Sequence, residues 1–283
     1  MTVKRNKNSR FSAPTVAPAR TRRVDKYELY RAAVQHPEHD VGLYQGFYRK
    51  LRGRRALSLR EDFCGTFSLA CAWVKSGPRQ TALALDLDPE PLEYGRTRYL
   101  PELGEDQRGR LRVLRKNVLS VTRPVDLIVA GNFSFCIFKD RKTLVSYFRH
   151  CAKSLKKGEG VLALDVAGGQ GMLEKGVDRR TVRAPGLGRF VYEWETRGFD
   201  PITHDARYAI HFRLADGRRL RNAFTYDWRH WSIPEIRDAM SEAGFRKTAV
   251  FWDVSRDDRY ERLVLKEKTE DIHTFVAYVA GMV

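Results

Sequence analysis

The feature that most constrains this chain is a glycine-centred turn between an apolar strand and a helix, followed by a strand that ends in an acidic residue. The stretch LSLREDFCGTFSLACAWV places Gly65 after an apolar run and before apolar positions at helical spacing. The run TALALDL then contains Asp86, about 20 residues after the glycine turn. At this sequence separation a carboxylate can contact the diol of a ribose. This order is typical of a mononucleotide-binding β-α-β unit, so we expect a nucleoside ligand.

The turn carries carboxylates and a single glycine. A dinucleotide fold uses G-x-G-x-x-G so that backbone amides approach a pyrophosphate, whereas this turn reads EDFCGTF. Carboxylates at this place repel phosphate and attract an ammonium group. We therefore expect a nucleoside whose other half is an amino acid rather than a second nucleotide.

In these residues the chain resembles the class I S-adenosylmethionine-dependent methyltransferases, whose first motif runs acidic-x-Gly-x-Gly-x-Gly. Glu61 matches the acidic position and Gly65 the middle glycine, while Phe63 and Phe67 replace the outer glycines. A register shifted by one residue makes Asp62 the working carboxylate instead. The resemblance implies S-adenosylmethionine as cofactor, with these contacts from the turn and the next strand end: Glu61, Cys64, Gly65, Thr66, Asp86 and Leu87.

Further matches follow the next two expected strands. After a strand at residues 111–114, the family places a polar side chain against the adenine, which implies contacts from Asn117 and Val118. The alternative is that Asn117 only forms a turn. After the fourth strand, at residues 125–130, the resemblance implies that Asn132 touches the cofactor and Phe135 the substrate, because ligands of open α/β sheets bind at this edge.

The remaining pattern predicts a Rossmann-like, seven-stranded α/β sheet with helices on both faces and two additions. Residues 25–53 read as an N-terminal helical cap, and a methyltransferase domain follows over residues 54–283. Three alternating segments predict an antiparallel β insertion at about residues 188–231: 190–196, 206–214 and 219–228. In related methyltransferases such a cap closes over the cofactor, here through Tyr27 or Tyr30, unless these rings only pack against the sheet.

The β insertion supplies the substrate-side candidates. In small-molecule methyltransferases an insertion at this point often covers the substrate, so Tyr226 and Trp228 either enclose the acceptor or fill the interior of the insertion. A base is needed only if the acceptor must lose a proton, and the sequence does not rank the polar residues that are candidates for this role. These candidates are Glu195, His204, His211, Tyr226, Asp227 and His230.

The formal charge of +17 is concentrated partly in residues 1–24, a leader rich in Lys, Arg, Ser and Pro. Its low hydrophobicity predicts disorder, and its charge suits a phosphate backbone such as that of RNA. The alternative is a generally basic surface without a nucleic-acid partner, since basic residues are also spread over the expected helices.

Composition limits the class of protein. The chain of 283 residues is 42% hydrophobic, enough for one large core, and it contains neither a membrane-length apolar run nor a secretion signal. The four cysteines are scattered, so we expect no disulfide framework and no metal site. We expect a cytoplasmic protein.

Together these patterns favour a methyltransferase that moves a methyl group from S-adenosylmethionine to a nitrogen or oxygen atom of a small molecule. Two alternatives remain open: an RNA methyltransferase guided by the basic leader, and a protein that binds S-adenosylmethionine without catalysis. A dehydrogenase fits the turn less well, because the dinucleotide glycines are missing.

Overall fold

The computed structural model describes residues 25–253, 263–270 and 272–283. The basic leader over residues 1–24 lies outside the described residues, as does part of the connection before the last strand. Within the described residues no helix combines the length and apolar character needed to cross a membrane.

The main sheet has the strand order β11-β10-β12-β5-β4-β1-β2-β3. Its five strands from β5 to β3 are parallel, and β12 joins β5 in the antiparallel direction. The seven expected strands are present, and the three-residue edge strand β11 is an eighth that the sequence did not predict. The bounds are β1 Ser58–Asp62, β2 Thr81–Asp86, β3 Leu111–Arg115, β4 Leu127–Ala130, β5 Val161–Gly168, β10 Lys247–Asp253, β11 Leu263–Leu265 and β12 Phe275–Met282.

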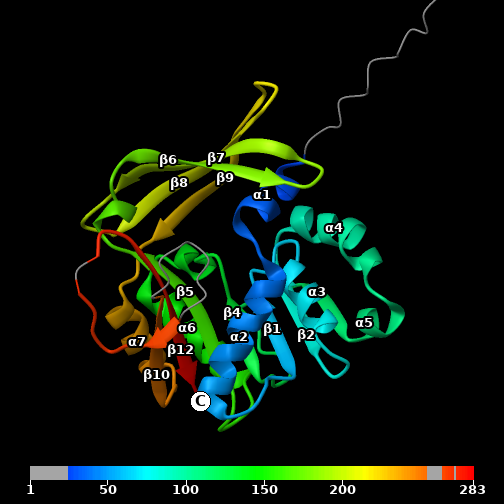
Figure 1. Cartoon of the computed structure of the whole chain (residues 1–283). Coiled ribbons are helices and arrows are strands. Elements are labelled where there is room, and N and C mark those ends of the chain that lie inside the picture. The colour runs from blue at the N-terminus through cyan, green and yellow to red at the C-terminus, as the bar shows by residue number, and fades with distance from the viewer. Residues whose placement is uncertain (1–24, 254–262, 271) are drawn as a thin grey trace, which may run out of the picture.

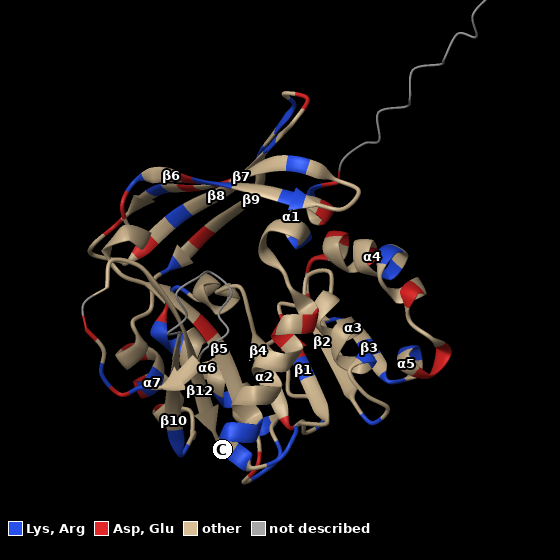
Figure 2. Cartoon of the chain, in the orientation of Figure 1, with Lys and Arg blue, Asp and Glu red and all other residues tan. Residues whose placement is uncertain are grey.

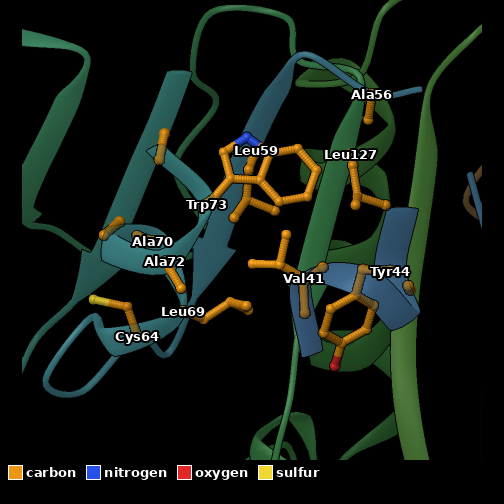
Figure 3. Close-up of a cluster of buried hydrophobic side chains, with 14 of the residues drawn as sticks. Val41, Tyr44, Ala56, Leu59, Cys64, Leu69, Ala70, Ala72, Trp73 and Leu127 are labelled. Atoms are coloured by element: carbon orange, nitrogen blue, oxygen red, sulfur yellow. The ribbon is translucent and has the colours of Figure 1, made fainter. Parts of the chain in front are cut away.

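Helices cover both faces of this sheet (Figure 1). One face packs against α2 (Pro37–Arg52), α3 (Ser68–Lys75) and α4 (Pro89–Arg98), and the other against α6 (Arg141–Lys153) and α7 (Ile233–Glu242). The central strand β4 is buried on both sides, which explains its uninterrupted apolar sequence LIVA. Figure 3 shows Trp73 of α3, which is fully buried, beside Leu59 and Leu127 of the sheet. Short helices complete the connections: α5 (Glu105–Gly109), η1 (Leu100–Glu102), η2 (Ser134–Ile137) and η3 (Gln170–Met172).

A second, four-stranded antiparallel sheet, which we call the roof sheet, lies above the carboxyl ends of the parallel strands (Figure 1). Its strands are β6 Gly176–Ala184, β7 Gly188–Phe199, β8 Asp205–Leu214 and β9 Arg219–Arg229. The sequence predicted three of these strands and a start near residue 188, which is wrong by one strand. Strand β6 was missed because most of its residues are exposed, so the sequence GVDRRTVRA lacks the alternation that marks a half-buried strand.

Helix α1 (Lys26–Val34) joins the roof sheet to the main body. Its N-cap is Asp25, whose side chain accepts a hydrogen bond from the Tyr27 amide, and its buried residues Leu29 and Ala33 pack against apolar side chains of β7 and β8. The carbonyl of Ala33 also accepts a hydrogen bond from Arg180 of β6. Helices α1 and α2 thus occupy the range in which the sequence predicts a helical cap, and α1 contacts the sheet that covers the strand ends.

The turn from β1 to α3 has an uncommon backbone. Phe63, Gly65 and Phe67 have φ angles of 55°, 52° and 50°, all in the left-handed region. A left-handed conformation costs a residue with a side chain about 1–2 kcal/mol, so both phenylalanines are strained. Packing offsets this cost: the Phe63 ring contacts Phe138 and Tyr147, and Phe67 is fully buried.

Gly95 of α4 makes room for this turn, and we expect Gly95→Ala to destabilise the protein. An added Cβ would lie 2.4 Å from the Thr66 carbonyl oxygen and 2.4 Å from the Phe67 ring. The clash should outweigh the gain of about 1 kcal/mol in helix propensity and lower the free energy of unfolding by about 1–3 kcal/mol. Urea denaturation followed by circular dichroism measures this change.

Gly42→Ala in α2 is the matched control. No heavy atom lies within 4 Å of a Cβ built at Gly42, so this substitution should raise the free energy of unfolding by up to about 1 kcal/mol. Equal stability of the two variants would contradict the close packing of α4 on the turn.

Candidate functional site

The tips of β1 and β2 lie side by side beneath the roof sheet, and hydrogen bonds tie them together. The Gly65 amide donates to Asp86 Oδ2 at 2.7 Å, and the Cys64 amide donates to the Leu85 carbonyl at 3.0 Å. The other oxygen of Asp86 accepts from the Asp88 amide at 2.9 Å. The structure therefore brings the predicted turn and the predicted ribose carboxylate into direct contact.

Glu61 and Asp62 point to opposite faces of the sheet. Glu61 Oε2 accepts a hydrogen bond from the Ala70 amide in the first turn of α3 at 2.9 Å, and burial raises the pKa of its carboxyl to about 8. Asp62 is fully engaged on the other face, where it accepts from Arg60 at 2.7 Å and from the Tyr147 hydroxyl at 2.9 Å. This geometry favours Glu61 over Asp62 as the carboxylate that faces a ligand at the turn.

The remaining residues predicted around the nucleoside differ in exposure. Cys64 and Thr66 are buried in the turn, whereas Leu87 is 56% exposed immediately after Asp86. Asn117 is exposed and its Oδ1 accepts from the Leu119 amide at 2.9 Å, so it does form the turn that the alternative interpretation predicted. Its amide –NH₂ group and a second oxygen lone pair are left for a ligand. Val118 is buried beside β2.

The loop after β4 is held by a carboxylate that the sequence analysis missed. Asp165 of β5 accepts hydrogen bonds from the amides of Asn132 at 2.7 Å and Phe133 at 2.9 Å. Both donors have left-handed backbones, with φ angles of 55° and 56°. Burial raises the pKa of Asp165 to about 7 despite these two hydrogen bonds. The sequence LALDV carried the signal, because it places an acid late in a buried strand, as TALALD does for Asp86.

Of the two residues predicted in that loop, the structure leaves one accessible. Asn132 is exposed, whereas Phe135 is fully buried among apolar side chains of the α6 face. Its aromatic type after a strand suggested a ligand contact, but the same residue type suits a core position equally well.

Two tyrosines of the N-terminal helices approach Asp165. Tyr44 of α2 is 5% exposed, and a Cβ built on Gly131 would lie 3.4 Å from its hydroxyl. Burial raises the pKa of the Tyr44 hydroxyl well above its usual value, and the charge of Asp165 adds to the shift. The pKa of Tyr30 is raised in the same way by burial and by neighbouring tyrosines, Tyr226 first. In Figure 3 the Tyr44 hydroxyl points away from the labelled apolar side chains.

The inner face of the roof sheet is aromatic. Tyr226 and Trp228 of β9 lie with ring centroids 4.3 Å apart, and Trp194 of β7 stacks on Tyr226 at 5.8 Å. Phe133, from the loop after β4, contacts Trp228 at 6.2 Å. The predicted substrate-side rings are thus part of one aromatic cluster that rests on the loop held by Asp165.

Most of the polar residues considered as bases have other partners. Glu195 pairs with Arg197 and His211, and Asp227 pairs with Lys139 at 2.5 Å. The His230 ring hydrogen-bonds the Tyr208 hydroxyl, and burial lowers the pKa of this histidine to about 4. His204 is exposed in the turn between β7 and β8. The structure does not gather these residues into a site.

The strand tips concentrate carboxyl groups in a strongly basic chain. Among the described residues, Glu61, Asp86 and Asp165 form no ion pair with Lys or Arg, and Asp40 of α2 contacts only His39 in this way. Figure 2 shows acidic segments beneath the roof sheet, and Lys and Arg both on the roof strands, among acidic and uncharged segments, and at the opposite end of the main sheet. Unpaired carboxylates that are partly buried favour a cationic ligand. The described part of the chain has no cluster of three or more His, Cys, Asp or Glu suited to a metal ion.

Comparisons with known proteins place the fold. No family model matches the chain, and no curated protein does. Among solved structures, DesVI of Streptomyces venezuelae is similar at a TM-score of 0.68 and 17% identity, covering 92% of this chain and 98% of its own. CalS10, an amino pentose methyltransferase of Micromonospora echinaspora solved with S-adenosylmethionine bound, gives 0.66 and 15%, covering 92% and 98%.

A third similar structure is the sugar N-methyltransferase KedS8 of a Streptoalloteichus species, at a TM-score of 0.63 and 18% identity, covering 98% of this chain and 99% of its own. The alignments run over nearly the whole length of both chains, although few residues are shared. The chain therefore has the fold of the class I S-adenosylmethionine-dependent methyltransferases.

Proposed function

We propose that the protein is a methyltransferase that uses S-adenosylmethionine to methylate an amine nitrogen of a small molecule. The observation that carries the proposal is the contact of Glu61, Gly65 and Asp86 at the adjacent tips of β1 and β2. Two proteins of similar structure, a sugar N-methyltransferase and an amino pentose methyltransferase, support the acceptor class.

The residues at the strand tips fit the cofactor. Asp86 has lone pairs left for the ribose hydroxyls beyond its two backbone hydrogen bonds, and exposed Leu87 provides an apolar surface for the base. Glu61 holds the ammonium of the methionyl part beside the turn that includes Cys64 and Thr66. Further contacts that we assign to the nucleoside and the methionyl part come from Asn117, Val118 and Asn132.

An amine acceptor suits the charges around Asp165. An alkyl ammonium entering beneath the roof sheet meets the Asp165 carboxylate and the Tyr44 hydroxyl, while Tyr226 and Trp228 cover its apolar part. A carboxylate acceptor would instead meet Asp165, Asp40 and Glu61 as like charges.

The chemistry asks little of the protein beyond placement and proton removal. S-adenosylmethionine supplies an electrophilic methyl group when bound. Asp165 takes a proton from the acceptor ammonium, which frees the nitrogen lone pair to attack, and the aromatic cluster of the roof sheet excludes water from the nucleophile. The backbone amide of Phe133 donates a hydrogen bond to Asp165, and the Phe133 ring contacts Trp228. Phe133 therefore keeps the loop after β4 in contact with that cluster.

Asp86→Ala should weaken binding of both S-adenosylmethionine and its demethylated product by about 1–3 kcal/mol, because a charged hydrogen-bond partner of the ribose is lost. Isothermal titration calorimetry measures both affinities. Asp88→Ala is the control, since Asp88 caps α4 through the Glu90 amide and lies beyond the strand tip. Unchanged affinity in folded Asp86→Ala protein would refute the ribose assignment, and a wild-type protein that binds neither ligand would refute the proposed function.

Binding of S-adenosylhomocysteine at pH 7 should release about one proton from Glu61. The raised pKa of about 8 keeps this carboxyl protonated in the free protein, and the ligand ammonium favours the ionised form. Calorimetry in phosphate and in Tris, which differ in ionisation heat, counts the protons released. Glu61→Gln should abolish the difference between the buffers and weaken binding.

The pH dependence of stability provides a second readout for Glu61. Its pKa in the folded protein exceeds the ordinary value of 4.5, so the folded protein holds the proton more tightly and the free energy of unfolding falls as pH rises from 4.5 to about 8. Glu61→Gln should flatten this fall in the ligand-free protein. An identical pH dependence in both proteins would show that Glu61 is not buried as an acid.

With an amine acceptor, kcat/KM should rise with pH along a limb whose apparent pKa is at or below about 7, the value for Asp165. Asp165→Asn should lower kcat by about 10²–10⁴-fold and remove this limb, because the base is lost. Tyr44→Phe is the milder variant and should keep the limb. Stopped assays at saturating cofactor over pH 5.5–9 test this, and an unaltered limb in Asp165→Asn would assign the proton to another group.

A further inference from the structure

Arg60 of β1 is a fully buried cation in the middle of the main sheet. Its one carboxylate partner is Asp62, which accepts from Arg60 Nε at 2.7 Å and from Nη2 at 3.2 Å. Burying an ion pair costs desolvation free energy that the attraction between the charges often offsets only in part. Apolar side chains of similar size in the same place often give a protein of equal or higher stability. The pair therefore calls for an explanation other than stability.

Apart from Asp62 and Ser154, the hydrogen-bond partners of Arg60 lie in the connection between β3 and β4. Nη2 donates to the Val118 carbonyl at 2.6 Å, and Nη1 donates to the Ser120 carbonyl at 3.0 Å and to Thr122 Oγ1 at 3.3 Å. Ser154 at the end of α6 reinforces this arrangement, because its hydroxyl accepts from Arg60 at 3.1 Å and from the Thr122 amide at 3.0 Å. One planar guanidinium thus binds Val118, Ser120 and Thr122, three residues of a connection that contains no strand or helix.

This segment begins beside the ribose carboxylate. The Lys116 amide donates to the Asp86 carbonyl at 2.9 Å, and Asn117 and Val118 follow directly. Asn117 accepts hydrogen bonds from the Leu119 and Ser120 amides, which lie within the turn itself, so the position of the turn relative to β2 depends on what else holds Val118 and Ser120. Arg60 of β1 supplies those contacts.

We propose that Arg60 is a positioning residue that fixes the 117–120 segment against the purine of the bound nucleoside and so determines the preference for a 6-amino over a 6-oxo purine. The inference rests on the proposed function. Asn117 Oδ1 accepts from an exocyclic amino group, whereas a 6-oxo group places an acceptor against that oxygen. Such discrimination needs the two groups at fixed distance, which a planar five-donor side chain provides.

Arg60→Lys tests the proposal in the full-length protein. Lysine keeps a positive charge near Asp62 but cannot hold the Val118 and Ser120 carbonyls in one plane. The probes are S-adenosylhomocysteine and S-inosylhomocysteine, which differ in the 6-substituent of the purine and in the proton that the 6-oxo purine carries on N1. Calorimetry gives both dissociation constants. We expect the wild-type protein to prefer the adenosyl ligand by at least about 10-fold and Arg60→Lys to reduce that ratio toward 1, chiefly by weakening the adenosyl ligand.

A merely structural role would lower both affinities together. Val145→Ala in α6 is the control, because it removes buried volume from the same face of the sheet without removing a hydrogen bond to the segment. It should keep the wild-type ratio. If Arg60→Lys does not fold, Ser154→Ala removes a contact of both Arg60 and Thr122 and should reduce the ratio to a smaller extent. A preserved ratio in the folded variant, or a wild-type protein that binds both ligands equally, overturns the inference, whereas a wild-type protein that binds neither overturns the proposed function.

Discussion

The left-handed backbone at Phe63, Gly65 and Phe67 is the constraint on which the strand-tip site depends. It turns the chain sharply enough for the Gly65 amide to reach Asp86 and for the first turn of α3 to reach Glu61. Only glycine adopts this conformation without strain, so the two phenylalanines must be held by packing. The aromatic contacts of Phe63 and the glycine at position 95 are therefore as much a part of the site as its carboxylates.

The charged groups at the strand tips differ in sign from the chain as a whole, which is strongly basic. A chain of net charge +17 keeps its strand-tip carboxylates without Lys or Arg partners in the described residues, and burial raises the pKa of Glu61 and Asp165. In the absence of a ligand these groups reduce stability as they ionise, because water is excluded and no cation replaces it. Asp62, the residue after Glu61, differs from these groups because it is paired with a buried cation, Arg60.

Some features of the fold and the site could be predicted from local sequence patterns, and others could not. The turn, Asp86 and the parallel order of the sheet were predicted because strand period, a glycine and an acidic strand end are all local signals. Phe135 was proposed as a substrate contact but lies in the core, and β6 was missed, because residue type alone does not tell which face of an element is covered. Asp165 was not predicted, although its strand also places an acidic residue late in a buried apolar run, as that of Asp86 does.

Sequence alone specified a nucleoside fold with an acidic turn, since the spacing of Gly65 and Asp86 and the lack of phosphate-binding glycines are written in consecutive residues. It left open which of Glu61 and Asp62 lies on the side of α3, because adjacent strand residues point to opposite sides and only the packed helices distinguish them. The meeting of Asp165, Tyr44 and the aromatic face of the roof sheet joins segments far apart in the chain. Long-range packing sets that proximity, and no local pattern encodes it.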